Sequence, residues 1–324
     1  MLIMLKRFSY ILILALLFSG CGNRKGGDSD VAPYTIATLK GPSSMGMIRL
    51  IDSLNTGSSH SVEVKILNEP LQVRKMMLDG SADFAILPTT MAAIMYNKGL
   101  DYRLIAVPVW GTLYLVGSDT TVSSWEDLRG KRVYVMARGM TPDVLFRYLL
   151  INNGIDPEKD ITPDYSFPTH IDLANAVAAG KAPLAVLSEP LASLVAERNT
   201  GIRHIFDLGT EWDRFVDTPM AETAFLGSAE IIRDNPGLVE SVVSAYSLST
   251  EWVNRHPDSA ALLIVKYDIL PDPDVAVTAI QGSNLRFESA AAVEKDVMDY
   301  LNVFYKLNPD IVGGKLPDED FIAH

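Results

Sequence analysis

The sequence of 324 residues contains a single cysteine, Cys21, so no disulfide within the chain can hold the fold together. It is also short of basic residues: 28 Lys and Arg stand against 40 Asp and Glu, which gives a formal net charge of −12. This balance argues against nucleic acid as the main partner, because binding it requires a surface that neutralises phosphates. A small anionic ligand remains possible, since a pocket can be locally positive on an acidic protein.

The motifs of common enzyme and metal-site classes are missing as well. The five histidines lack metal-ligand spacing, and there is no His-Glu-x-x-His sequence. The stretch 312–315 lacks the upstream glycine and the following Ser or Thr of a phosphate-binding loop, and neither Gly-x-Ser-x-Gly nor Gly-x-Gly-x-x-Gly occurs. These absences weigh against a hydrolase, an ATPase or a dinucleotide-binding enzyme. We therefore expect no metal and no cofactor. The histidines are His60, His170, His204, His256 and His324.

The composition that is present is that of an ordinary globular protein. Hydrophobic residues make up 48% of the chain and charged residues 21%, which excludes a disordered or collagen-like protein. The length suits two lobes or domains of roughly 150 residues each.

The N-terminus has the pattern of a targeting segment. Lys6 and Arg7 precede an apolar run over 8–18, which is about half of the ~20 residues that a membrane-spanning helix needs. The sequence Leu-Phe-Ser-Gly-Cys that ends at Cys21 resembles the lipobox of bacterial lipoproteins, with Phe18 where Leu is more usual. It implies a signal peptide over 1–20, a lipidated linker over 21–32 and an acyl anchor on Cys21, with the protein attached to a bacterial membrane and facing the periplasm. The alternative is a buried core cysteine beside an uncleaved anchor.

Beyond the linker, short apolar strands alternate with helical patterns. Strands are expected at 34–39, 62–67, 83–87 and 103–109, with helices between them, and this order indicates an open, mostly parallel sheet. A second series of strands and helices follows over 132–206. The stretches 111–117 and 221–226 are candidate crossings between the two series, and the chain from 229 onward is expected to be helical.

Four stretches resemble periplasmic solute-binding proteins. They are Asp79–Pro88 (DGSADFAILP), Ser124–Val133 (SWEDLRGKRV), the segment Arg138–Asp160 and the segment Asn235–Pro257. The resemblance is closest to the branch that serves ATP-driven importers of nitrate, sulfonate, taurine and the thiamine pyrimidine precursor. It implies the two-lobed α/β fold of type II periplasmic binding proteins, in which two hinge-connected open mixed sheets are flanked by helices, with a helical C-terminal region. Lobe 1 would comprise 33–118 plus 219–324, and lobe 2 would comprise 119–218.

The same resemblance implies a function without chemistry. The chain would be the substrate-binding component of an ABC importer that captures a small polar solute between its lobes and delivers it to a membrane permease. It would act as a monomer. Two alternatives remain at this stage: an enzyme on the same fold, similar to menaquinone-pathway enzymes or the thiamine-pyrimidine synthase, and a receptor that reports to a sensor protein.

Three loops of lobe 1 are expected to face the ligand, because the carboxyl ends of parallel strands and the starts of the following helices point to one crevice. Ser43 and Ser44 follow the first strand, and they either bind ligand or cap the next helix. Thr89 and Thr90 follow the third strand with the same two alternatives. Near the crossing, Trp110 either stacks on a flat ligand or fills the lobe junction, and Thr112 follows it. These six residues are candidates for ligand binding.

Lobe 2 supplies four further candidates. Arg138 and Thr141 precede a helix, and the guanidinium of Arg138 either pairs with an anionic ligand or is a solvated surface charge. Ser188 and Glu189 end an apolar strand. The carboxylate of Glu189 argues for an amine or ring N–H on the ligand or for a hydrogen bond that closes the lobes, with a helix-dipole carboxylate as the alternative. The two charges argue in opposite directions, so the sign of the ligand charge stays open.

Overall fold

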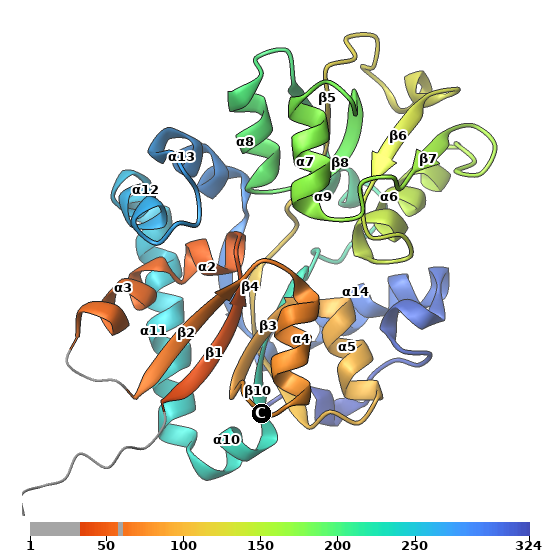
Figure 1. The fold of residues 1–324 in the computed structure, drawn as a ribbon. Coiled ribbons are helices and arrows are strands. Elements are labelled where there is room, and N and C mark those ends of the chain that lie inside the picture. The colour runs from red at the N-terminus through yellow and green to blue at the C-terminus, as the bar shows by residue number, and fades with distance from the viewer. Residues whose placement is uncertain (1–32, 58–60) are drawn as a thin grey trace, which may run out of the picture. The chain divides into compact units, whose positions relative to one another are not determined.

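The computed structural model describes residues 33–57 and 61–324. The expected signal peptide, the linker and Cys21 lie outside these residues. The described chain forms two mixed sheets flanked by helices, with the N-terminal and C-terminal thirds around the first sheet and the middle third around the second (Figure 1).

The first sheet has six strands in the order β11-β4-β10-β3-β1-β2. β1 is parallel to β2 and to β3, whereas β10 lies between β3 and β4 and is antiparallel to both. The second of the expected crossings is therefore inserted into the sheet. The strands are β1 (Tyr34–Leu39), β2 (Val62–Leu67), β3 (Phe84–Pro88), β4 (Tyr102–Val109), β10 (Thr223–Ser228) and β11 (Leu285–Ser289).

Alternating side chains of β3 show how both faces of the first sheet are covered. Ala85 and Leu87 belong to a core with α4, α5 and α14, whereas Phe84 and Ile86 belong to a core with α3, α11, α12 and α13. A strand that is apolar at every position suits burial on both faces. The helices around this sheet are α2 (Pro42–Gly46), α3 (Ile48–Thr56), α4 (Pro70–Leu78), α5 (Thr89–Asn97), α10 (Ala229–Asp234), α11 (Pro236–Arg255), α12 (Pro257–Lys266), α13 (Pro273–Gly282) and α14 (Glu294–Leu307).

The second sheet has five strands in the order β7-β6-β8-β5-β9. β6 is parallel to β7 and β8, and β5 is antiparallel to β8 and β9. One face packs on α6 and α9, and the other on α7 and α8. The strands are β5 (Leu113–Gly117), β6 (Arg132–Val135), β7 (Thr162–Asp164), β8 (Leu184–Ser188) and β9 (Arg203–Asp207). The helices are α6 (Thr141–Asn152), α7 (His170–Ala178), α8 (Leu191–Arg198) and α9 (Leu208–Trp212).

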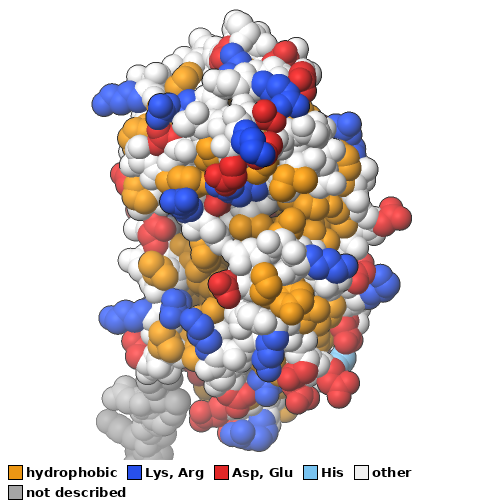
Figure 2. Space-filling model, turned by 90° about the vertical axis from the view of Figure 1, so that its right-hand side faces the viewer, with side chains coloured by type: hydrophobic (Ala, Val, Ile, Leu, Met, Phe, Trp, Pro, Cys, Tyr) orange, Lys and Arg blue, Asp and Glu red, His pale blue; other side chains and the backbone are white. Residues whose placement is uncertain are grey.

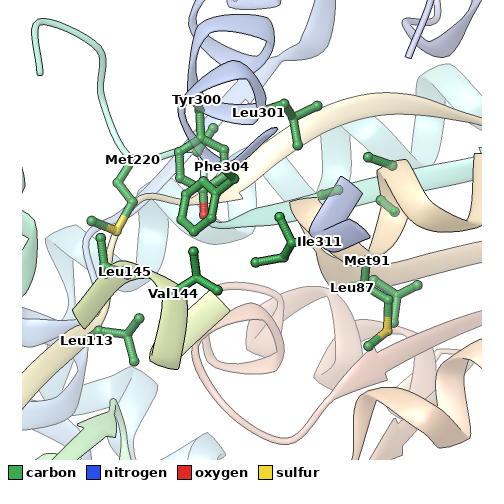
Figure 3. Close-up of a cluster of buried hydrophobic side chains, with 14 of the residues drawn as sticks. Leu87, Met91, Leu113, Val144, Leu145, Met220, Tyr300, Leu301, Phe304 and Ile311 are labelled. Carbon is green, nitrogen blue, oxygen red and sulfur yellow. The ribbon is translucent and has the colours of Figure 1, made fainter. Parts of the chain in front are cut away.

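One hydrophobic core runs through both halves of the structure. Tyr300 and Phe304 of α14 lie beside Val144 and Leu145 of α6 in the cluster of Figure 3, and Leu301 belongs to the same cluster. Helix α14 therefore packs both against one face of the first sheet and against α6, a helix of the second sheet.

The prediction that the chain is helical from 229 onward is wrong at β11. This strand, Leu285–Ser289, pairs with the edge of β4 through a register shift. Its burial pattern is irregular, with an exposed second residue and two half-buried residues in its middle. Such an edge strand has no clear alternation, so the sequence gives little sign of it.

Short single-turn elements complete the described chain. They are η1 (Trp125–Leu128), η2 (Ala290–Ala292), η3 (Pro309–Val312) and η4 (Glu319–Phe321). No helix within the described ranges is long and apolar enough to cross a membrane. On the face shown in Figure 2, acidic and basic side chains are interspersed, and hydrophobic side chains are exposed over its middle part.

Candidate functional site

Two helix N-termini meet where the first sheet faces the second. α5 begins directly after β3, and α6 begins in the loop after β6. The hydroxyl oxygens of Thr90 and Thr141, both buried, lie 2.8 Å apart and form a hydrogen bond. The structure thus brings together two predicted site residues that are 51 positions apart in the sequence.

Neither of these helix starts is capped by a side chain. In the described structure, the residues before them, Pro88 and Met140, make no capping hydrogen bond. The first-turn N–H groups of a helix have no partner within the helix, and its dipole is positive at that end. Two uncapped starts at one place therefore favour a negatively charged or oxygen-rich group there.

Thr89 adds a free hydrogen-bonding group to this place. Its side chain is fully buried, and its hydroxyl oxygen has no hydrogen-bond partner among the described residues. Its backbone N–H donates to the carbonyl oxygen of Glu222 at 2.9 Å. A buried polar atom without a partner is unfavourable, so a ligand or water that bonds to it would be stabilised.

Ser43 and Ser44 are buried and engaged within their own loop. Ser44 Oγ accepts from the N–H of Gly41 at 3.1 Å and donates to its carbonyl oxygen at 3.0 Å. Ser43 Oγ lies 3.2 Å from the hydroxyl of Thr38. This is the helix-capping alternative stated for the pair. The loop nevertheless faces the second sheet, because a Cβ atom at Gly41 would lie 3.6 Å from Pro190.

Glu189 lies one residue before the N-cap of α8 and bonds to the first turn of this helix. Its carboxylate accepts hydrogen bonds from the N–H and the hydroxyl of Ser193, at 3.2 and 2.9 Å. Burial raises the pKa of Glu189 to about 7, and the hydrogen bonds from Ser193 oppose the rise. The neighbouring Ser188 hydroxyl bonds to His170 Nδ1 at 3.1 Å, and burial lowers the pKa of this histidine to about 4. The imidazole is therefore neutral at pH 7.

Trp110 lies at the junction of the two sheets, which is the packing alternative stated for it. It is 7% exposed, and its indole N–H donates to the carbonyl oxygen of Arg286 at 2.8 Å. The guanidinium of Arg286 stands over the ring, 4.1 Å from its centroid.

Thr112 joins the two chain crossings through Glu222. Its N–H and hydroxyl donate to the two carboxylate oxygens of Glu222 at 2.6 and 3.0 Å. Burial raises the pKa of Glu222 to about 6, and these two hydrogen bonds oppose the rise. Glu222 was not among the predicted site residues. The sequence offers one signal for it, a lone carboxylate at the start of an otherwise apolar crossing strand.

Arg138 is exposed on the loop before α6, and its guanidinium lies 5.2 Å from the ring centroid of Tyr165. The loop is held by Asp143, which accepts from the N–H of Gly139 at 2.8 Å and from Arg147 at 2.9 Å. The guanidinium of Arg138 therefore lies near the start of α6. Within the described chain, the carboxylate on this loop, Asp143, pairs with Arg147 and not with Arg138. Arg138 remains able to pair with an anion.

The described residues contain no cluster of His, Cys, Asp or Glu that could hold a metal ion.

Residues 44–211, more than half of the chain, match the family described as the periplasmic substrate-binding protein of phosphonate ABC transporters. The chain belongs to this family. Among curated proteins, this periplasmic binding protein is 27% identical over 172 residues to YtlA of Bacillus subtilis, which is named as a binding protein. That alignment covers 53% of the chain and 49% of YtlA, so the chain spans about half the length of this relative.

Solved structures agree over a larger part of the chain. A crystal structure from Parabacteroides distasonis, described as an ABC transporter, is 26% identical with a TM-score of 0.75 and aligns over 90% of this chain and 99% of that one. The aliphatic sulphonate binding protein SsuA of Escherichia coli is 19% identical with a TM-score of 0.69, over 88% and 92%. At that identity the likeness shows the fold alone.

These findings confirm the resemblance to periplasmic solute-binding proteins and the two-sheet α/β fold class. The family consists of substrate-binding proteins, so the prediction that the chain is not an enzyme is confirmed as well. The proposed roles of the individual site residues and the boundaries of the two lobes stay predictions.

The carboxyl of Glu222 gives a testable effect on stability. Because its pKa is about 6 in the folded protein and near 4.5 in the unfolded chain, it contributes stability below pH 4.5 that is lost as the pH rises through 6. Glu222→Gln keeps an acceptor and a donor for Thr112. We expect it to be more stable than the parent at pH 8, on the order of 1–2 kcal/mol, and similar at pH 4.5. Urea unfolding at both pH values measures this.

The matched control is Glu240→Gln on the exposed side of α11. It changes the charge by the same amount and should leave the pH dependence as it is. A Glu222→Gln protein that is less stable than the parent at pH 8 and similar to it at pH 4.5 would show that the ionised carboxylate is needed in the fold.

Proposed function

We propose that this protein is the substrate-binding component of an ABC importer and that it captures a small anion with a sulfonate or phosphonate group. The observation that carries the proposal is the meeting of the α5 and α6 N-termini at the Thr90–Thr141 hydrogen bond. The first turns supply N–H donors and two positive dipole ends, and Thr89 supplies a buried hydroxyl without a partner. Arg138 adds a cation one loop away from α6.

A sulfonate and a phosphonate share the chemistry that this place would recognise. Each presents three oxygens that accept several hydrogen bonds and carry negative charge. The family description names phosphonate, and the SsuA relatives are named for sulfonates. The support for this chain comes from the donors around Thr90 and Thr141. Nitrate and the thiamine pyrimidine precursor are the two other ligand types implied by the sequence resemblance, and both are arms of the test below.

The buried carboxyl of Glu189 supports a ligand that also carries an amine. The next residue, Pro190, lies against the loop that contains Gly41. Among the described residues, only Ser193 donates hydrogen bonds to the Glu189 carboxylate. An ammonium group would compensate its charge without an added proton. Taurine and aminoalkylphosphonates combine both features, and comparison with their unaminated analogues tests the role of Glu189.

Binding would be coupled to a closing motion of two lobes, 33–118 plus 219–324 and 119–218. The crossings that would serve as hinges are tied by the Thr112–Glu222 hydrogen bonds, and Gly111 between Trp110 and Thr112 has a φ of +79°, which glycine adopts without strain. Ligand that contacts both helix starts stabilises the closed form by its differential affinity. The closed protein, acting as a monomer, would then deliver the anion to a membrane permease while anchored through Cys21.

Calorimetric titration tests the ligand class. The panel comprises ethanesulfonate, taurine, methylphosphonate, 2-aminoethylphosphonate, nitrate and the hydroxymethylpyrimidine. We expect at least one sulfonate or phosphonate to bind with a Kd near 1 μM, about −8 kcal/mol. The affinity should fall in Thr141→Val, which keeps the shape of the side chain and removes its hydroxyl. Binding of the pyrimidine with no response to any oxyanion would overturn the proposal.

A further inference from the structure

Gly282, the last residue of α13, lies against Glu189 and Tyr114 of the second half of the protein, and α13 also packs on α8. A Cβ atom at this position would lie 2.6 Å from Glu189 Oε1, so a side chain here requires the carboxyl group to move. The carbonyl oxygen of Gly282 also accepts a hydrogen bond of 2.8 Å from the hydroxyl of Tyr114 in β5. The backbone of Gly282 lies outside the left-handed region, so the contact and not the conformation accounts for the glycine.

At this contact, the carboxyl group of Glu189 lies in surroundings that disfavour its negative charge. It is 2% exposed, and it faces the C-terminal end of α13, where the helix dipole is negative. The charged group that acts on it is Asp207, which is acidic too. The favourable contacts are those from Ser193 at the start of α8. Among the other titratable neighbours, Tyr114 and the His170 that bonds to Ser188 are both neutral at pH 7. His204 packs on the ring of Tyr114, and Glu222, whose pKa burial raises to about 6, bonds to the Thr112 that accepts from the N–H of Glu189.

We propose that the approach of α13 to the second sheet is coupled to the uptake of one proton at Glu189, and that Gly282 is the residue that permits this approach. The inference rests on the closing motion of the proposed function. It adds that protonation of Glu189 shifts the balance between the two forms even when no ligand is bound. A neutral Glu189 can lie against Gly282, whereas an ionised one favours separation of the two surfaces and access of water to its carboxylate.

The direction of the pH effect follows from the two states. In the form seen here, burial raises the pKa of Glu189 to about 7, and in a separated form water would return it toward 4.5. The approached form therefore binds the proton more tightly, and it is favoured as the pH falls from 7 to 4.5. The ratio of approached to separated protein should change by up to about two orders of magnitude across this window.

Distances between spin labels measure this ratio directly in the ligand-free chain. Exposed Lys75 of α4 and Lys181 before β8 serve as label positions after substitution to Cys in a Cys21→Ser background. We expect the short-distance population to grow as the pH is lowered from 8 to 5. In a Glu222→Gln background, which removes the other carboxyl that titrates in this range, the population should no longer depend on pH in Glu189→Gln, whereas Glu197→Gln on the exposed side of α8 should behave as the parent does.

Two variants test the contact itself. Gly282→Ala should shift the protein to the long distance at every pH, and Gly237→Ala, where a Cβ atom meets nothing within 4 Å, should not. If Gly282→Ala fails to fold, Tyr114→Phe removes only the hydrogen bond to Gly282 and should lower the short-distance ratio several-fold. A ratio that is constant with pH in the parent chain, or an unchanged ratio in both contact variants, overturns the inference. Because no ligand is present, failure of the anion titration would leave this result standing.

Discussion

Replacement of Thr141 by Asp should abolish binding of a sulfonate or phosphonate, with a loss of affinity of at least about 100-fold. Thr141 is the first residue of α6, and its hydroxyl forms the contact with Thr90. Because Thr141 is buried and the same first turn already holds Asp143, urea unfolding must first show that the variant is folded. The carboxylate would repel the anion and take up the positive end of the helix. Calorimetric titration with the best ligand of the panel measures the loss.

Thr120→Asp is the matched control for this change. Thr120 lies in the exposed turn after β5. Its replacement by Asp introduces the same charge into the same half of the protein. It should keep the parent affinity within about twofold. An unchanged affinity in a folded Thr141→Asp protein would place the anion away from the helix starts.

The second large effect is on stability. Trp212→Ala should lower the free energy of unfolding by about 3–5 kcal/mol, because a large buried ring is lost. Trp212 is fully buried in α9, and its ring lies 5.9 Å from that of Tyr300 and 6.0 Å from that of Phe304, both in α14. Its indole N–H donates to the carbonyl oxygen of Thr218 at 2.6 Å, which would be left without this donor. Urea unfolding measures the difference.

Trp212→Phe separates the two parts of this effect, since it keeps an aromatic ring and removes the N–H donor. It should lose clearly less than Trp212→Ala. Leu248→Ala serves as the control, because Leu248 is 61% exposed and its truncation should change stability by less than about 0.5 kcal/mol. If Trp212→Ala were as mild as this control, the shared core of Figure 3 would not hold α14 to the second half of the chain.

The elements that carry the site could be predicted because their local signals agree. The strand before Thr89 is apolar at every position, and the helix after it starts at once, so the strand end and helix start are clear in the sequence. Pro142 in the first turn of α6 is a similarly local signal. The general rule that such ends share one crevice predicts that they lie close together, and in the structure the Thr90 and Thr141 hydroxyls form a hydrogen bond.

What could not be predicted depends on partners far along the chain. Glu222 has a role only because Thr112 lies opposite it, 110 residues away in the sequence. The glycine at 282 is explained by the carboxyl group of Glu189, which is contributed by another helix start. The edge strand β11 exists because β4 offers it an unpaired edge. The local sequence around each of these residues does not predict its distant partner.

The two charged candidates take different places in the structure. Arg138 is exposed and has no ion-pair partner among the described residues, whereas Glu189 is buried and bonded to its own helix start. The sequence alone left the sign of the ligand charge open, because both were possible ligand contacts. Under the proposed function the anion binds at the helix starts, and Glu189 has a conditional role, in which a proton or a ligand ammonium group neutralises it.

A crystal structure of the protein grown with the tightest-binding sulfonate or phosphonate tests the central claim most directly. The anion should lie between the first turns of α5 and α6, with its oxygens within hydrogen-bond distance of Thr90, Thr141 or the adjacent backbone N–H groups. Density for the anion at any other place, with the Thr90–Thr141 hydrogen bond intact and nothing bound beside it, would contradict the claim.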